Sequence, residues 1–194
     1  AAVEYFGHGT TVATNALIQH RGADTGLITT EGFRDLLEIG RQKRPSLYDM
    51  NADKPQPLVS RDMRFEVAER VRSDGSVETA LDVEAVRDAV RKMAEADVKA
   101  IAVCCLYGFL TPEHEQQILD IIAEEHPGAF RSASHAVAPE FREYERMSTT
   151  VVNAYLGPVM ERYIQRLKLR LALEGFGGCV DRGIGRGGHG HAAV

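Results

Sequence analysis

The segment from Val98 to Tyr107, VKAIAVCCLY, is apolar throughout except for Lys99. A continuous apolar run bounded by segments of helical periodicity is typical of a strand whose two faces are both covered. Such strands occur in parallel sheets, because the helices that connect parallel strands pack on both faces of the sheet. This run therefore predicts an α/β domain with residues 98–107 as a central strand.

The segments on either side of this run have helical patterns. Residues 83–93 follow Asp82, a good helix cap, and repeat apolar side chains at three- and four-residue steps. Downstream, a helix is expected to start at Thr111-Pro112-Glu113 and to end at Pro127-Gly128. With a short strand expected at 25–30 and a short helix at 32–39, strand and helix alternate, as in α/β domains.

Two further segments complete the expected architecture. Residues 64–72 alternate apolar and charged side chains and precede the turn residues Asp74-Gly75, which predicts a β-hairpin with residues 77–81. A last helix is expected from about Ser148 to Glu174, kinked or interrupted at Pro158. Its second half carries an apolar stripe, made of Met160, Ile164, Leu167 and Leu171.

Composition excludes several classes of protein. The chain has 194 residues, 44% of them hydrophobic, and 23 basic against 28 acidic side chains, for a net charge of −5. This balance argues against nucleic-acid binding, and no apolar run approaches the roughly 20 residues of a membrane span. The three cysteines, Cys104, Cys105 and Cys179, have neither disulfide nor metal spacing. We expect a cytoplasmic protein whose buried Cys104 and Cys105 are not nucleophiles.

The first candidate site is a glycine turn that leads into a helix near residues 12–19. Backbone N–H groups at such a turn, together with nearby hydroxyl and amide groups, can hold a phosphate or a carboxylate. An ordinary capped helix explains the same residues, so both interpretations stay open. The residues concerned are His8, Gly9, Thr10, Thr11, Thr14 and Asn15.

The second candidate site is a polar run between a predicted strand and the last helix, where ligands gather in open α/β sheets. It opens with Ser134-His135 and continues through residues 139–146. Arg142 and Arg146 stand four apart, so on a helix they can face one anion together. A solvated, salt-bridged helix entry is the alternative. The candidates here are Glu140, Arg142, Glu143 and Arg146.

Other polar groups are interpreted as structural or solvated. Residues 41–61 carry three prolines and a small basic cluster of Arg41, Lys43 and Arg44, which predicts a long surface loop. The histidines His20, His114 and His126 are expected at the surface. Residues 177–194 are rich in glycine, lack strand or helix periodicity, and are expected to be disordered.

Two long blocks resemble the hydantoinase A / 5-oxoprolinase family. The first is HGTTVATNA at residues 8–16, followed by GLITTEGFRDLLEIGR at 26–41. The second is Ser134-His135, then PEFREYER at 139–146 and STTVVNAY at 148–155. They occur in the order of the family, and the resemblance covers roughly residues 3–176. It predicts one unit over residues 1–176, followed by a tail at 177–194 that is hypothesised to be translated out of frame or to result from a misjudged gene end.

The resemblance implies part of an actin-like, ribonuclease-H-like ATPase lobe, and the β-hairpin predicted above is an insertion in it. It also implies an ATP-driven reaction, with Mg²⁺, in which a cyclic amide or ketone oxygen is phosphorylated and the activated carbon is attacked. Cyclic amides such as 5-oxoproline or a hydantoin are the implied substrates. A hydantoinase B-type subunit or fused domain is the implied partner.

The family's phosphate hairpin, Asp-x-Gly-Gly-Thr-x-x-Asp, and its later glycine-rich phosphate motif have no counterpart in this chain. We therefore expect a fragment of the enzyme that is inactive alone and has no metal site of its own. Two alternatives stay open. The chain is a subunit of an acetone-type carboxylase, or it is a non-catalytic docking module whose apolar stripe contacts a partner.

Overall fold

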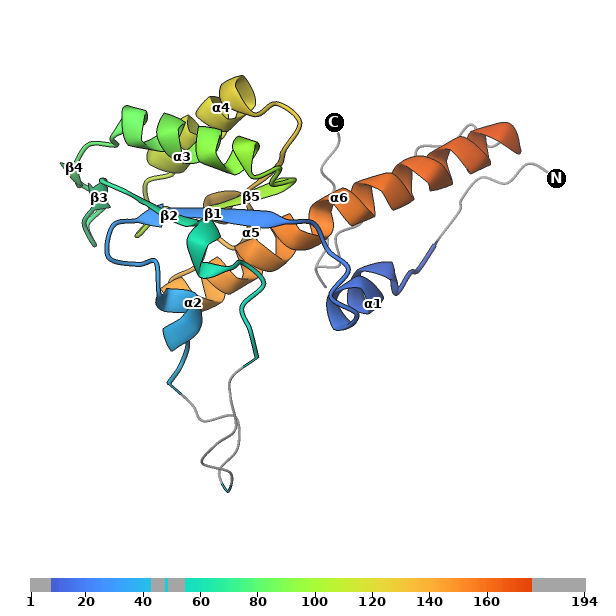
Figure 1. The fold of residues 1–194 in the computed structure, drawn as a ribbon, viewed down its shortest axis with the longest axis horizontal. Coiled ribbons are helices and arrows are strands. Elements are labelled where there is room, and N and C mark those ends of the chain that lie inside the picture. Colours follow the sequence, from blue (N-terminus) through green and yellow to red (C-terminus); the bar gives the residue numbers. More distant parts are fainter. Residues whose placement is uncertain (1–7, 43–47, 49–54, 176–194) are drawn as a thin grey trace.

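The computed structural model describes residues 8–42, 48 and 55–175. In these residues, four parallel strands form the main sheet, in the order β2-β1-β5-β6 (Figure 1). Their bounds are β1 Thr25–Thr30, β2 Arg64–Val67, β5 Ala100–Cys104 and β6 Phe130–Ala133. The predicted parallel α/β architecture is confirmed, with β5 between two neighbours and buried along its whole length.

Helices cover both faces of this sheet, as Figure 1 shows, with α3 and α4 on one face and α6 on the other. Successive residues of a strand point to opposite faces, so Ile28 and Val103 pack under α3 and α4, while Leu27 and Ala102 pack under α6. The helices are α1 Val12–Ile18, α2 Leu36–Ile39, α3 Val83–Glu95, α4 Glu113–Glu125, α5 Ser134–Val137 and α6 Glu143–Leu173, with a 3₁₀ turn η1 at Arg61–Met63.

The predicted hairpin over 64–72 and 77–81 is wrong in its first half. Residues 64–67 form β2, which pairs with β1 in parallel. Only Arg70–Val71, as β3, pairs antiparallel with Val77–Thr79, as β4. Alternation of apolar and polar residues is the same in a parallel edge strand and in a hairpin, so the pattern does not distinguish them. The chain leaves the main sheet before Glu69, whose side chain is buried.

The long helix α6 starts earlier than predicted and is not interrupted at Pro158, while a kink at that residue stays a prediction. It begins at Glu143 instead of near Ser148, and it runs through Pro158 without interruption. A proline inside a helix removes one backbone hydrogen-bond donor. A helix can still continue through it when packing holds the backbone on both sides. Here Ala154 and Tyr155 are buried, and Gly157 lies directly against the ring of Phe130. Packing against the sheet therefore outweighs the lost hydrogen bond.

The predicted helix over 32–39 is confined to α2, Leu36–Ile39. The tail at 177–194 lies outside the described residues, as do Lys43, Arg44 and Cys179. The boundary between residues 1–176 and the tail stays a prediction. No helix in the described ranges is long and apolar enough to cross a membrane.

Close contact between α6 and β6 yields a first prediction. A Cβ atom added at Gly157 would meet the ring of Phe130 at 2.3 Å, so the ring must move. Overpacking of this kind costs about 1–3 kcal/mol, against a gain of about 1 kcal/mol from replacing a helical glycine by alanine. We expect Gly157→Ala to lower the midpoint of urea unfolding. The control is Gly128→Ala, whose Cβ meets nothing within 4 Å. Equal midpoints for the two variants would contradict the packing argument.

Candidate functional site

The two candidate groups from the sequence lie far apart. The imidazole of His8 hydrogen-bonds the hydroxyl of Tyr163, and the two rings stack with centroids 5.9 Å apart. Tyr163 is in the second half of α6 by its number, whereas Glu143 opens the same helix. Figure 1 shows this helix extending past the sheet. At 1.5 Å per residue, roughly 30 Å of helix separates the two residues. The structure therefore does not join the two groups into one site.

The glycine turn forms an exposed corner. Its helix α1 has 7 residues and its cap residue Thr11 makes no side-chain cap bond within the described part of the chain. Instead the backbone N–H of Val12 donates to Thr10 Oγ1 at 3.2 Å, and Asn15 Nδ2 donates to Thr11 Oγ1 at 3.4 Å. All six candidate residues here are exposed: His8, Gly9, Thr10, Thr11, Thr14 and Asn15. Anion binding at this corner stays a prediction.

The second group lies where β5 and β6 end, at the edge that holds the start of α6. Glu140 and Arg142 are exposed, and the Arg142 guanidinium lies over the ring of Phe141, 5.5 Å from its centroid. Arg146, by contrast, is only 2% exposed. Arg142 precedes the helix with a left-handed φ of 79°. The two guanidiniums therefore do not face one anion together on a helical surface.

A buried carboxylate organises this edge. Glu115, in the first turn of α4, is fully buried. Its Oε1 accepts from the backbone N–H of Cys105 at 2.8 Å and from Ser134 Oγ at 2.5 Å. Its Oε2 accepts from the backbone N–H of His135 at 2.8 Å and lies 2.7 Å from that residue's Nδ1. One side chain thereby joins α4 to the ends of β5 and β6.

The same carboxylate controls the charge of His135. The hydrogen bond that His135 Nδ1 donates to Glu115 raises the pKa of the imidazole above its ordinary value, and burial opposes the shift. Because Nδ1 is held by Glu115, Nε2 is the nitrogen left to exchange a proton with solvent or a ligand. An imidazole oriented by a carboxylate is a typical arrangement for a general acid or base.

A second buried carboxylate lies at the end of β1. Glu69 Oε2 is 2.8 Å from His114 Nδ1, and Oε1 accepts from the Thr30 hydroxyl. The Thr30 Oγ1 in turn accepts from the backbone N–H of Leu106 at 2.8 Å. The expectation that His114 lies at the surface is wrong, because it is only 7% exposed. No sequence periodicity marks Glu69 or Glu115, and both were missed as functional candidates.

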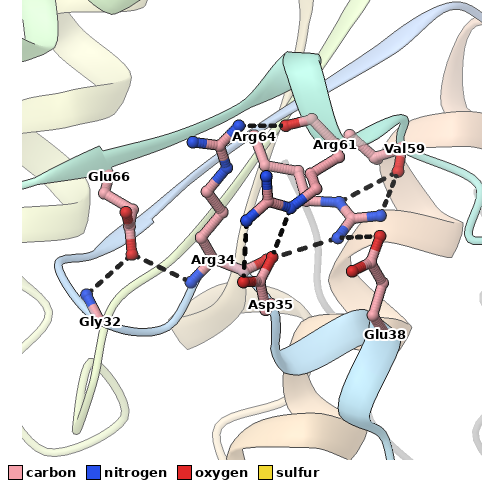
Figure 2. Close-up of polar contacts among 8 residues, drawn as sticks. All are labelled: Gly32, Arg34, Asp35, Glu38, Val59, Arg61, Arg64 and Glu66. Carbon is pink, nitrogen blue, oxygen red and sulfur yellow. Dashed lines mark hydrogen bonds and ion pairs between the residues drawn. The ribbon is translucent and has the colours of Figure 1, made fainter.

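Arginines hold the loop after β1 in place, as Figure 2 shows. The buried Arg64 donates to the Val59 carbonyl from Nε at 3.1 Å and from Nη2 at 2.9 Å, and its Nη1 lies 3.4 Å from Glu38. Arg61 makes two bonds to Asp35, at 3.0 and 3.1 Å, and these lower the pKa of the Asp35 carboxyl. The network fixes α2 against the edge strand β2.

Two more contacts complete this loop. Glu66 Oε1 accepts from the backbone N–H groups of Gly32 at 2.8 Å and Arg34 at 3.2 Å, from which Figure 2 draws the dashed lines. Arg41, expected in a solvated basic cluster, pairs with Glu145 of α6. The loop is therefore bound on one side to β2 and on the other to the start of α6.

Cys104 and Cys105 are buried, as predicted. Burial raises the pKa of the Cys104 thiol to about 12, and burial also raises that of Cys105 well above its usual value. A thiol in such surroundings carries almost no thiolate near neutral pH and is a poor nucleophile. In residues 8–42, 48 and 55–175, no group of three or more His, Cys, Asp or Glu side chains is placed to hold a metal ion.

A parallel α/β sheet with polar groups at the carboxyl ends of its strands is the arrangement in which open α/β proteins bind ligands. The hydantoinase/oxoprolinase N-terminal region matches residues 1–126 of this chain. The chain therefore belongs to the hydantoinase/oxoprolinase family, as its two sequence blocks indicate.

Three relatives show the range of this family. The chain is 41% identical to caprolactamase subunit alpha of Pseudomonas jessenii, over 82% of this chain and 23% of that subunit. It is 37% identical to the acetophenone carboxylase gamma subunit of Aromatoleum aromaticum, over 91% and 26%. It is 32% identical to 5-oxoprolinase 1 of Arabidopsis thaliana, over 84% and 14%. The chain thus spans about a quarter or less of the length of these relatives.

Two solved structures share the fold. The ATP-dependent caprolactamase of Pseudomonas jessenii superposes with a TM-score of 0.81 at 39% identity, covering 89% of this chain and 25% of that one. Nucleotide-free acetone carboxylase superposes with a TM-score of 0.76 at 26% identity, covering 86% and 25%. The α/β fold described above is therefore the fold of one portion of these larger enzymes.

Glu115 is expected to stabilise the fold strongly. Glu115→Gln replaces an acceptor oxygen by an NH₂ group that faces donors, so we expect a loss of about 2–3 kcal/mol of unfolding free energy. The control is Glu113→Gln, an exposed residue in the same helical turn, which should change little. Urea unfolding measures both variants. A midpoint for Glu115→Gln equal to that of the control would contradict this role.

The pair also predicts a pH dependence. Since folding raises the pKa of His135, its protonation stabilises the fold below the unfolded-state pKa of about 6.5. That stabilisation is lost as the pH rises through the raised, folded-state pKa. We expect the stability difference between wild type and His135→Gln to shrink as the pH rises from 6 to about 8. A difference that stays constant over this range, measured by urea unfolding at each pH, would argue against a protonated pair.

Proposed function

We propose that this chain is a portion of an ATP-dependent enzyme that acts on a cyclic amide, of the 5-oxoprolinase or N-methylhydantoinase type. The supporting observation is its similarity to the ATP-dependent caprolactamase, at a TM-score of 0.81 and 39% identity over 89% of this chain. As in the family resemblance, the portion is proposed to be part of an actin-like ATPase lobe, located in the cytoplasm and inactive alone.

The proposed reaction follows from the chemistry of amides. A lactam carbonyl is a poor electrophile, and its oxygen is a poor leaving group. ATP supplies a phosphoryl group that converts the oxygen into a phosphate ester and so lowers both barriers. Among the described residues, no group of three or more His, Cys, Asp or Glu side chains is placed to hold Mg²⁺. We therefore propose that Mg²⁺ is held by other parts of a full-length enzyme.

Within this chain, we propose that the edge at the carboxyl ends of β5 and β6 faces the ligand. Ligands in open α/β sheets bind there, and it holds the oriented imidazole of His135 together with Glu140, Arg142, Glu143 and Arg146. In the other candidate group, His8 contacts Tyr163, which lies roughly 30 Å along α6 from Glu143. We propose that the corner at residues 8–15 binds a different chemical group, which belongs either to the same ligand or to the neighbouring lobe.

A partner subunit is part of the proposal. Two of the relatives are named as subunits, alpha of caprolactamase and gamma of acetophenone carboxylase. We propose that a hydantoinase B-type subunit or fused domain completes the enzyme. The second candidate function, a subunit of an acetone-type carboxylase, is favoured by the 37% identity to the acetophenone carboxylase gamma subunit.

A full-length enzyme that contains this segment, assembled with its partner, provides the test. We expect ATP hydrolysis that depends on added 5-oxoproline or hydantoin. Hydrolysis driven by acetone or acetophenone with bicarbonate would favour the carboxylase, and hydrolysis independent of any of these compounds would overturn both proposals.

In the same assay, changing both Thr10 and Thr11 to Val should raise KM or lower kcat at least tenfold if the corner binds phosphate or substrate. Thr79→Val, at an exposed strand residue, is the control.

A further inference from the structure

Arg146 is a buried cation whose donors are largely unused. Its side chain is among the largest in the structure that are almost fully buried, at 2% exposure. Nη2 donates to the Cys105 carbonyl at 2.8 Å, but Nε and Nη1 have no hydrogen-bond partner among the described residues. Buried polar groups are nearly always paired, so an arginine with two orphaned nitrogens needs an explanation.

Neighbouring carboxylates do not supply the missing acceptors. Glu115 accepts from the backbone N–H of Cys105, and Arg146 donates to the carbonyl of the same residue. Each Glu115 oxygen already accepts two hydrogen bonds. Glu145, in the same turn of α6 as Arg146, pairs with Arg41. In the part of the chain that the structure describes, no carboxylate lies within ion-pair distance of Arg146. The guanidinium is therefore positioned to bind an anion from elsewhere.

The turn that follows β5 contacts this guanidinium. The ring of Phe109 lies over it, with the centroid 5.2 Å from the Arg146 Cζ. Phe109 is only half-buried, and the next residue, Leu110, is 48% exposed. Within the same turn Tyr107 has a left-handed φ of 55°, a conformation that strains a non-glycine residue. One partly exposed ring, carried on a turn with a left-handed residue, thus lies over the Arg146 guanidinium.

We propose that Arg146 binds an oxyanion, a phosphate or a carboxylate, at the carboxyl end of β5, and that the turn carrying Phe109 moves aside to admit it. A guanidinium offers two parallel N–H donors to such a group. This inference deepens the proposed function. The biological source of the anion rests on that function, and it is a phosphate of the nucleotide or product, or a carboxylate of the substrate. Binding of the anion itself is a property of this chain.

The test uses the whole 194-residue chain and inorganic phosphate, titrated at constant ionic strength against chloride. The Nε–H resonance of Arg146 in a ¹H–¹⁵N spectrum is the direct readout, and the unfolding temperature is the second. We expect a saturable shift of that resonance and a rise in Tm. In Arg146→Met the Tm response should weaken at least tenfold in apparent affinity. Arg170→Met, at an exposed site on the same helix, should respond like wild type.

Two further arms complete the test without ATP, so its failure is distinguishable from failure of the enzymatic proposal. Acetate in place of phosphate tells a carboxylate site from a phosphate site, since a response to one alone assigns that group. Phe109→Ala should bind the anion at least as tightly as wild type, because the cover is removed. An Nε–H resonance unmoved by both anions, equal Tm responses in Arg146→Met and wild type, or loss of binding in Phe109→Ala would each overturn the proposal.

Discussion

Four hydrogen bonds to the fully buried carboxylate of Glu115 hold together the end of β5, the end of β6 and the start of α4. A carboxylate removed from water is costly unless each oxygen is paired, and here each oxygen accepts two bonds. Gly108 must be glycine for this arrangement, since a Cβ there would lie 2.6 Å from Glu115 Oε1. The polar edge of the sheet and the orientation of His135 both depend on this one side chain.

Buried charges of both signs lie close together at this edge, but only the carboxylates have charged or polar partners for all of their oxygens. Glu115 and Glu69 are each paired with a histidine, whereas Arg146 uses one nitrogen on a backbone carbonyl and leaves two without a partner. Fully paired groups stabilise a fold, and an unpaired buried group is typical of a site that something else completes. This contrast separates the structural carboxylates from the arginine that we propose binds an anion.

The relatives give this edge a context. In a family that includes a caprolactamase subunit, an acetophenone carboxylase subunit and a 5-oxoprolinase, one α/β portion is shared by enzymes named for different substrates. A common portion fits a common chemical task, such as holding a phosphate or carboxylate, better than the choice of substrate. We propose that substrate choice lies with other parts of those enzymes, which are about four times longer or more than this chain.

The sequence by itself determined the elements that depend on local pattern: the buried strand β5, the capped helix α3 with Asp82, and the membership of the family. It did not distinguish a parallel edge strand from a hairpin at residues 64–67, because both have the same alternation. It did not show how far apart the two candidate groups lie along α6, and it placed His114 at the surface. Only the tertiary structure decided these points, because burial and pairing of Glu69, Glu115 and Arg146 depend on strands and helices that meet across long stretches of sequence.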